Sequence, residues 1–269
     1  MRIPFVKMHG LGNDFIVLDA RETALPEISN AIAKALSDRR EGIGCDQVIL
    51  LGPSDAADFC MRIFNSDGGE VEACGNASRA IALLHGEKAV VETSGGTITV
   101  EPSAEGAAVD IGSPKFAWEA IPLDYAMDTA AMPVSWDALS NPMAVNVGNP
   151  HVVFFVEDAD AIDLGVLGPE IEHDPLFPER INVNVASLVS TNHLKLYVWE
   201  RGAGLTRACG TGACATAVAA IRKGLAQSPV TIALPGGDLQ IAWEKGDTIR
   251  MSGPATEAYR GSFEWDDYA

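Results

Sequence analysis

Two cysteines of this chain occur in nearly the same local sequence. Cys74 lies in Ala73-Cys74-Gly75-Asn76 and Cys209 lies in Ala208-Cys209-Gly210-Thr211, at a separation of 209 − 74 = 135 residues. A thiolate can remove a proton from carbon, and a thiol can return one. Two thiols at equivalent places of a duplicated chain therefore predict proton removal on one face of a carbon atom and proton return on the other, which inverts a stereocentre.

The residues after each cysteine predict a site for a carboxylate. A glycine follows, and Asn76 or Thr211 is then expected to cap an apolar helix. The start of a helix presents N–H groups and the positive end of the helix dipole. We expect the backbone at Gly75 and Gly210 to hold a carboxylate, and the same field to lower the pKa of both thiols. Alternatively, each cysteine is a small core residue, but its repetition favours the catalytic interpretation.

The surrounding sequence repeats as well. Gly12-Asn13 recurs as Gly148-Asn149, and Gly95-Gly96 recurs as Gly236-Gly237, in the same order along the chain. Such ordered repeats indicate a duplicated architecture. We predict an N-terminal domain of residues 1–115, joined by the tail 255–269, and a C-terminal domain of residues 116–254. The stretch 115–145 carries three prolines and no clear period, so we interpret it as a connector.

Apolar runs and glycine positions predict the secondary structure. Helices are expected over 27–38, 77–84 and 213–223, the last two ending at Gly86 and Gly224. Strands are expected over 47–51, 59–64, 88–93, 97–101, 107–111, 230–234, 238–243 and 248–251. The predicted fold class is α+β: two pseudo-symmetric domains from an internal duplication, each a curved, mostly antiparallel sheet around a central helix.

Composition narrows the classes of partner. The formal charge of −18 argues against nucleic acid and anionic membranes, because both select clustered Lys and Arg. We find no secretory signal in residues 1–20 and no apolar run of membrane-spanning length. The five cysteines are odd in number and form no CxxC pair, which argues against a disulfide framework or a zinc site and favours a cytoplasmic location.

Several longer segments resemble one known family, the diaminopimelate epimerases, which are cofactor-independent isomerases of bacterial lysine and cell-wall synthesis. The matching segments span nearly the whole chain, and the one around Cys209 is the most specific. They are Met8-His9-Gly10-Leu11-Gly12-Asn13-Asp14-Phe15, Gly42-Ile43-Gly44-Cys45-Asp46-Gln47, Met61-Arg62-Ile63-Phe64-Asn65, Cys74-Gly75-Asn76, Gly148-Asn149-Pro150-His151, Arg180-Ile181-Asn182, Trp199-Glu200-Arg201-Gly202-Ala203-Gly204 and Ala208-Cys209-Gly210-Thr211-Gly212-Ala213-Cys214-Ala215.

The resemblance implies an active site in the cleft between two domains, with Cys74 and Cys209 as the acid–base pair. It implies backbone contacts to the reacting carboxylate at Gly75, Asn76, Gly210 and Thr211. It also implies a small-molecule amino-acid substrate, no cofactor, no metal and a homodimer. The side chains that it places along the substrate pocket are Asn13, Gln47, Asn65, Asn149, Asn182, Glu200 and Arg201. His151 is expected to support this site.

The residue chemistry agrees with that substrate. Diaminopimelate carries an amino and a carboxylate group at each end, Arg201 can bind a carboxylate through two hydrogen bonds, and Glu200 can pair with an ammonium. The chain departs from the family pattern at Ala77, Ser78 and Ala80, where Gly, Ala and Cys are common. Because Ala77 tolerates helical dihedrals, we expect the geometry of the turn to survive.

Two alternatives remain open at this stage. One is a proline or hydroxyproline racemase on the same scaffold, although racemases of that type usually carry Cys-Gly-His where this chain has Cys74-Gly75-Asn76. The other is a non-catalytic protein that uses its cysteines to bind a metal or to respond to oxidation.

Overall fold

The structure, a computed structural model, describes residues 1–72 and 74–268. The fold is α+β, with a preponderance of strand. The chain forms two compact units, Met1–Val109 with the residues from Ser252 onward, and Asp110–Met251. The boundaries therefore fall a few residues before the predicted 115/116 and 254/255. Ala73 of the predicted cysteine motif and Ala269 of the predicted tail lie outside the described residues.

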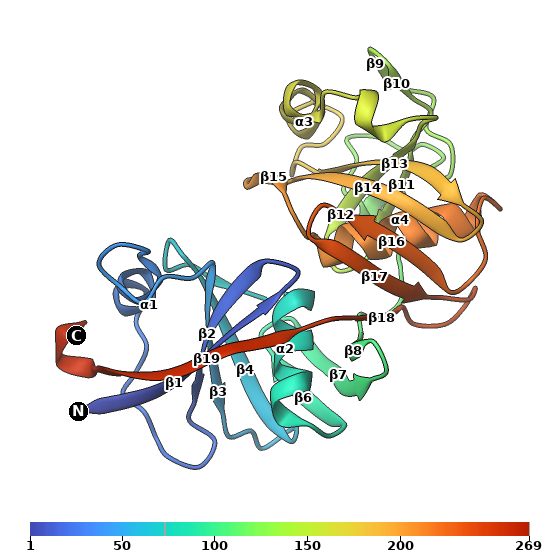
Figure 1. The fold of residues 1–269 in the computed structure, drawn as a ribbon. Helices are drawn as coiled ribbons and strands as arrows, with labels where there is room; N and C mark the ends of the chain where they lie inside the picture. The colour runs from blue at the N-terminus through green and yellow to red at the C-terminus, as the bar shows by residue number, and fades with distance from the viewer. Residues whose placement is uncertain (73, 269) are drawn as a thin grey trace. The chain divides into compact units, whose positions relative to one another are not determined.

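The first unit is a sheet with two helices (Figure 1). Its helices are α1 (Asn30–Ser37) and α2 (Gly75–His85), and the 3-10 turn η3 (Trp265–Asp267) follows its last strand. Its strands are β1 (Arg2–Gly10), β2 (Asn13–Asp19), β3 (Gln47–Gly52), β4 (Phe59–Asn65), β5 (Glu70–Val71), β6 (Ala89–Thr93), β7 (Gly96–Ser103), β8 (Gly106–Asp110) and β19 (Thr256–Glu264).

The second unit again combines a sheet with two helices, α3 (Leu164–Glu172) and α4 (Gly210–Arg222) (Figure 1). It also holds the 3-10 turns η1 (Trp118–Ala120) and η2 (Ala159–Ala161). Its strands are β9 (Ser135–Trp136), β10 (Leu139–Ser140), β11 (Met143–Asn146), β12 (Pro150–Phe155), β13 (Asn182–Ser190), β14 (His193–Glu200), β15 (Gly204–Thr206), β16 (Val230–Leu234), β17 (Gly237–Ala242) and β18 (Arg250–Gly253).

One pattern of strand pairing occurs in both units. In the first, β2 is parallel to β3, β3 antiparallel to β4, β4 parallel to β6, and β6 antiparallel to β7. In the second, β12, β13, β14, β16 and β17 repeat these pairings in the same order and directions. In chain order, α1 lies between β2 and β3, as α3 lies between β12 and β13. Likewise, α2 lies between β5 and β6, and α4 lies between β15 and β16. The predicted internal duplication is therefore present in the fold.

The helices that follow the two cysteines are the central ones. Helix α4 is buried along most of its length and contacts β11, β12, β16 and β17. Helix α2 ends at Gly86, whose φ of 82° lies in the left-handed region and whose N–H bonds to the Ala82 carbonyl. This is the αL termination that glycine favours, and it confirms the predicted end of the helix.

The starts of the helices differ from the prediction. Cys74 and Cys209 themselves are the N-caps, so Asn76 and Thr211 lie in the first turns of α2 and α4. Helix α1 begins at Asn30, because Ser29 caps it by accepting a hydrogen bond from the Ile32 N–H at 3.3 Å. The predicted start at residue 27 is therefore three residues too early, because the serine cap sets the first turn.

The stretch 115–145 is not a bare connector. It contains η1 and a short hairpin in which Leu139 of β10 pairs with Trp136 of β9. Ile121, Met132 and Trp136 belong to the hydrophobic core of the second unit. The sequence pattern missed this because the buried residues come from irregular backbone, which has no period.

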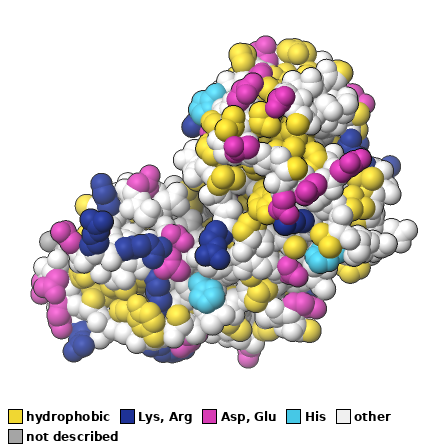
Figure 2. Space-filling view, turned by 45° about the horizontal axis from the view of Figure 1, so that its top comes forward, with side chains coloured by type: hydrophobic (Ala, Val, Ile, Leu, Met, Phe, Trp, Pro, Cys, Tyr) yellow, Lys and Arg dark blue, Asp and Glu magenta, His cyan; other side chains and the backbone are white. Residues whose placement is uncertain are grey.

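The C-terminal residues pair with the first strand. β19 is antiparallel to β1 over Arg2–His9, and Phe263 and Trp265 are buried in the core of the first unit. Acidic, basic and apolar side chains are interspersed on the face drawn in Figure 2. Among the described residues, we find no helix with the length and apolar character needed to cross a membrane.

Candidate active site

In the first unit, three predicted site residues lie at one edge of the sheet. Gln47 pairs with Asn65 across β3 and β4, and the Gln47 Nε2 donates to Asn65 Oδ1 at 2.9 Å. Asn13 begins β2, whose Phe15 pairs with Gln47. The start of β2, the start of β3 and the end of β4 therefore meet at this edge, and β5 leads from β4 toward Cys74.

Cys74 is half-buried at the start of α2. Its carbonyl accepts from the Ser78 N–H at 2.9 Å and from the Ser78 hydroxyl at 3.0 Å, which fixes the first turn. The Asn13 Nδ2 lies 3.8 Å from the Cys74 Sγ and donates to it. An amide donor of this kind stabilises a thiolate more than a thiol, because the hydrogen bond is stronger to a charged acceptor.

A buried arginine, Arg79, also stabilises the first turn of α2. Arg79 has no solvent-exposed surface, and its Nη2 donates to Asn76 Oδ1 at 2.8 Å. A Cβ at Gly10 would lie 3.2 Å from the Asn76 carbonyl, so a glycine lets the end of β1 approach the helix start closely. The Asn76 side chain is thus occupied within the protein, whereas its predicted role uses the backbone.

In the second unit, Cys209 is the buried counterpart. Its residue is 3% exposed, and its Sγ accepts from the Gly212 N–H at 3.3 Å. The Thr211 Oγ1 lies 3.5 Å from the same sulfur. A Cβ at Gly212 would lie 2.9 Å from Val198 and 3.2 Å from the Cys209 sulfur, so this position accommodates the thiol only as glycine.

The electrostatics of Cys209 contradict the predicted lowering of its pKa. Burial raises the pKa of this thiol well above its ordinary value, and the negative charge of Glu200 raises it further. Bonds from Thr211 and the Gly212 N–H act in the opposite direction but do not overcome them. The helix start is therefore outweighed by desolvation, and Cys209 is a protonated thiol at neutral pH.

Glu200 lies next to this thiol. The Thr206 hydroxyl donates to Glu200 Oε1 at 2.5 Å, and the Glu200 and Cys209 side chains share a hydrogen bond. Burial raises the pKa of Glu200, and these two bonds oppose the shift. The structure thus brings Glu200, Thr211 and Cys209 together in the second unit.

His151 is completely buried and contacts two predicted site residues, Asn149 and Thr211, and one residue that was not predicted, Asn184. Its Nε2 lies 2.9 Å from Asn149 Oδ1 and 3.1 Å from Thr211 Oγ1, and its Nδ1 lies 3.1 Å from Asn184 Oδ1. Burial, and to a smaller extent the nearby charge of Arg201, lower the pKa of His151 to about 4. The imidazole is therefore neutral at pH 7 and carries one N–H.

Asn182 and Arg201 are tied to each other through the backbone. The Asn182 Oδ1 accepts from the Arg201 N–H at 2.9 Å, and its Nδ2 donates to the Pro150 carbonyl at 2.8 Å. Asn182 is 2% exposed, so its side chain joins β12 to the 200–202 turn. The exposed Arg201 places its Nη1 on the Glu179 carbonyl at 3.1 Å.

Sequence reasoning missed several residues that hold these groups. Glu172, at the end of α3, accepts from the Trp199 Nε1 at 2.7 Å and from the Gly202 N–H at 2.9 Å, and so supports the turn that carries Glu200 and Arg201. Asn184 could have been found, since it lies two residues after Asn182 and therefore on the same face of β13. Nothing in the local sequence marks Glu172.

The described residues contain no group of His, Cys, Asp or Glu arranged to hold a metal ion. All five cysteines are thiols, with no disulfide among the described residues. The groups assembled in the two units are those of acid–base chemistry: a thiol and amides in the first, and a thiol, amides, a neutral imidazole and a carboxylate in the second.

Comparisons with known proteins identify the family. The sequence profile of diaminopimelate epimerase matches residues 5–117 and 143–257. The chain is 68% identical to a diaminopimelate epimerase of Erythrobacter litoralis over the full length of both chains. It is 63% identical to one of Sphingopyxis alaskensis over 98% of each chain.

Solved structures show the same fold at low identity. A probable proline racemase of Agrobacterium radiobacter, with bound carbonate, has 14% identity and a TM-score of 0.68, and the alignment covers 99% of this chain and 94% of the other. At 14% identity, this likeness is evidence for a common fold alone. From its sequence profile and its full-length relatives, this chain belongs to the diaminopimelate epimerase family.

Proposed function

We propose that this enzyme interconverts LL-2,6-diaminopimelate and meso-2,6-diaminopimelate by proton transfer between Cys74, Cys209 and the α-carbon, in the formation of precursors for lysine and peptidoglycan. The observation that carries the proposal is the placement of a thiol at the N-cap of the equivalent helix in both units, α2 and α4. Membership in the diaminopimelate epimerase family supports diaminopimelate as the substrate.

The proton balance of the reaction is simple. The thiolate of one cysteine takes the α-proton and becomes a thiol, and the electron pair left on carbon spreads into the adjacent carboxylate. The other cysteine donates its proton to the opposite face and becomes the thiolate. Neither oxidation nor an added cofactor is needed, and the reverse reaction exchanges the two roles. The proposal requires that both sulfurs reach one α-carbon.

The resting protonation of Cys209 suggests how one direction begins. Cys209 is a thiol because burial and Glu200 raise its pKa, so it is set to donate a proton. Cys74, half-buried and bonded by Asn13, then acts as the base in that direction. N–H groups at Gly75, Asn76, Gly210 and Thr211 would stabilise the charge that develops on the reacting carboxylate.

The remaining predicted residues would select the far end of the substrate. Arg201 is exposed and can bind a carboxylate, whereas Asn13, Gln47, Asn65 and Asn149 offer neutral hydrogen bonds. In this proposal Asn182 acts through Arg201, because its side-chain atoms are bonded to backbone groups. His151 acts through Thr211 and Asn149.

The central experiment is hydrogen exchange in deuterated water. The protein is incubated with LL-diaminopimelate and, separately, with L-proline, and α-deuterium and stereoisomers are followed. We expect exchange and inversion with diaminopimelate alone. Exchange with proline alone would make the enzyme a proline-type racemase, and exchange with neither substrate would favour a non-catalytic role for the cysteines.

A cysteine variant distinguishes a two-base mechanism from a one-base mechanism. Cys209→Ala retains Cys74, so we expect inversion to be lost while the isomer whose α-proton faces Cys74 still exchanges it with solvent. Retention of inversion in this variant would disprove the two-thiol mechanism. A variant of a cysteine outside the proposed site, Cys60→Ala, serves as the control.

We further propose that the protein works in the cytoplasm as a homodimer. The thiol form of all five cysteines supports a reducing compartment. Tyr259 on β19 is 50% exposed and offers an apolar contact for a second copy. Sedimentation velocity of the wild type and Tyr259→Glu tests the dimer: we expect dissociation in the variant, and a monomeric wild type would contradict it.

A further inference from the structure

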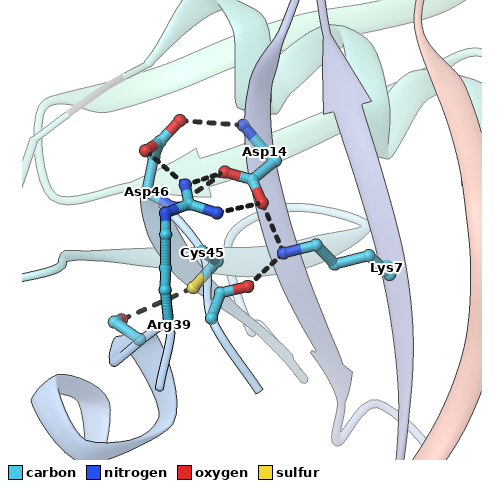
Figure 3. Close-up of polar contacts among 7 residues, drawn as sticks. Lys7, Asp14, Arg39, Cys45 and Asp46 are labelled. Carbon is cyan, nitrogen blue, oxygen red and sulfur yellow. Dashed lines mark hydrogen bonds and ion pairs between the residues drawn. The ribbon is translucent and has the colours of Figure 1, made fainter. Parts of the chain in front are cut away.

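Four charged residues of the first unit form an ionic cluster beside the edge that carries Asn13 and Gln47. The cluster consists of Lys7 on β1, Asp14 on β2, and Arg39 and Asp46 in the loop before β3 (Figure 3). Arg39 bridges both carboxylates, with its Nη2 at 2.6 Å from Asp14 Oδ1 and 2.8 Å from Asp46 Oδ1. The Lys7 Nζ lies 2.5 Å from Asp14 Oδ2 and also binds the Gly44 carbonyl.

The charges of this cluster balance, and its inner half is shielded from water. The side chains of Lys7 and Asp14 are 10% and 18% exposed, whereas those of Arg39 and Asp46 are 57% and 48% exposed. Burial alone would raise the pKa of Asp14, but Arg39 and Lys7 hold it well below its usual range. Asp14 is therefore ionised whenever the protein is folded near neutral pH.

The two carboxylates also join the backbones of two segments. The Asp14 N–H donates to Asp46 Oδ2 at 3.1 Å, and the Asp46 N–H donates to Asp14 Oδ1 at 3.1 Å. The Asp46 N–H lies 3.0 Å from the Asp14 carbonyl as well. These reciprocal bonds fix the start of β2 against the start of β3, and Arg39 holds both acceptor carboxylates in place.

Each of the joined residues is the direct neighbour of a predicted site residue. Asn13 precedes Asp14, and its amide donates to the Cys74 sulfur. Gln47 follows Asp46, and its amide donates to Asn65. A shift of either segment would therefore move an amide group of the site.

We propose that Lys7, Asp14, Arg39 and Asp46 are positioning residues, which hold the Asn13 amide on the Cys74 sulfur and the Gln47 amide on Asn65. The proposal rests on the proposed function in one respect, the role of Cys74 as an acid–base group. Arg39 is the member of the cluster best suited to a test by substitution, because its side chain is exposed and binds both carboxylates.

The test compares Arg39→Met with Arg62→Met. Arg62 forms a two-bonded ion pair with Glu70, at 2.9 and 2.8 Å, so its removal also breaks an Arg–carboxylate pair but touches neither Asn13 nor Gln47. Iodoacetamide alkylation of Cys74 is followed against pH by peptide mass spectrometry, together with diaminopimelate turnover and urea unfolding.

For Arg39→Met we expect the midpoint of Cys74 alkylation to move to higher pH, because the Asn13 donor no longer holds the thiolate. We expect kcat/KM to fall by about tenfold or more, as misplacement of a supporting group commonly causes. Arg39→Lys should lie between this variant and the wild type, since a lysine cannot bind both carboxylates in the planar manner of arginine. Arg62→Met should match the wild type in alkylation and turnover.

A coupling experiment tests the route through Asn13. If Arg39 acts by placing that amide, Arg39→Met should cause no further alkylation shift in an Asn13→Ala background. Equal alkylation midpoints and turnover in Arg39→Met and Arg62→Met would overturn the proposal, as would an undiminished shift in the Asn13→Ala background.

Two further measurements distinguish failure of the positioning proposal from failure of the proposed function and from a purely stabilising role of the cluster. The alkylation profile is read without substrate, so a protein that fails to exchange diaminopimelate would refute the proposed function and leave the positioning test intact. Asp14→Asn is measured beside Arg39→Met, with urea unfolding of both. A loss of stability with an unchanged alkylation profile in both variants would show that the cluster serves stability alone.

Discussion

The Asn184 side chain determines where the proton of His151 lies. Its Nδ2 donates to the Gly212 carbonyl at 2.9 Å and to Thr216 Oγ1 at 3.1 Å, so its Oδ1 is the atom that faces His151 Nδ1 at 3.1 Å. An oxygen can only accept a hydrogen bond there, and the neutral imidazole therefore carries its proton on Nδ1. Nε2 is left as an acceptor for the Thr211 hydroxyl.

This arrangement predicts the direction of the bonds that reach Cys209. The Thr211 hydroxyl has one proton, and when it donates to His151 the Cys209 thiol must donate to Thr211 Oγ1. The structure places Asn149 Oδ1 2.9 Å from Nε2, where two acceptors would face each other, so a proton on Nδ1 requires the Asn149 amide to be flipped, with its NH₂ group toward Nε2. We expect ¹⁵N NMR of the labelled protein to show His151 protonated on Nδ1 at pH 7. Asn184→Leu should mix the two tautomers, and a wild-type proton on Nε2 would contradict the argument.

The buried His151 predicts a loss of stability in mild acid. Its pKa is lowered from 6.5 to about 4, first by burial, so between these values the unfolded chain binds a proton that the folded protein does not. Stability therefore falls as the pH is lowered from about 6.5 to about 4, by about 3 kcal/mol in total for a shift of this size. Urea unfolding at several pH values measures the slope. His151→Gln should reduce the slope in this window, and an unchanged slope would refute the assignment.

The environment of Cys209 predicts slow alkylation. Burial and the charge of Glu200 both raise the pKa of this thiol, so it should react with iodoacetamide only at high pH and more slowly than the half-buried Cys74. Glu200→Gln removes the charge and should move the onset of Cys209 alkylation to lower pH. The exposed Glu244→Gln is the control. Rapid alkylation of Cys209 in the wild type at pH 7 would contradict the structure.

The hydrogen bonds of the Glu172 carboxylate predict that its substitution weakens substrate binding more than it slows turnover. Its two oxygens accept from Trp199 and Gly202, and Gln has one such oxygen, so Glu172→Gln leaves a buried donor facing an NH₂ group. We expect a loss of about 1–3 kcal/mol in unfolding free energy. The 199–202 turn carries Arg201, so KM for diaminopimelate should rise more than kcat falls. Glu170→Gln, exposed on the same helix, should change neither.

An outcome in which Glu172→Gln loses stability but keeps the wild-type KM would show that this carboxylate supports the fold without positioning Arg201. Equal effects of Glu172→Gln and Glu170→Gln would remove the role altogether.

Much of the fold could be predicted because the signals are local. The ends of α2 and α4 follow from glycines that tolerate left-handed backbone, and Gly86 adopts it with φ of 82°. The duplication is visible as ordered repeats, and the fold shows it as a repeated pairing pattern. The starts of these helices were predicted less well, because Asn76 and Thr211 are residue types that commonly cap helices, whereas the observed N-caps, Cys74 and Cys209, lie two residues earlier.

The sequence by itself determined which groups could do chemistry: two thiols in equivalent turns, several amides, and the Glu200-Arg201 pair. Only the tertiary structure decided their protonation states and their supports. The helix start near Cys209 is a local feature and favours a thiolate, but desolvation depends on everything packed around the sulfur and outweighs it. The contacts of Asn184 with Gly212, of Glu172 with Gly202 and of Lys7 with Asp14 join residues from separate elements, so folding alone brings them together.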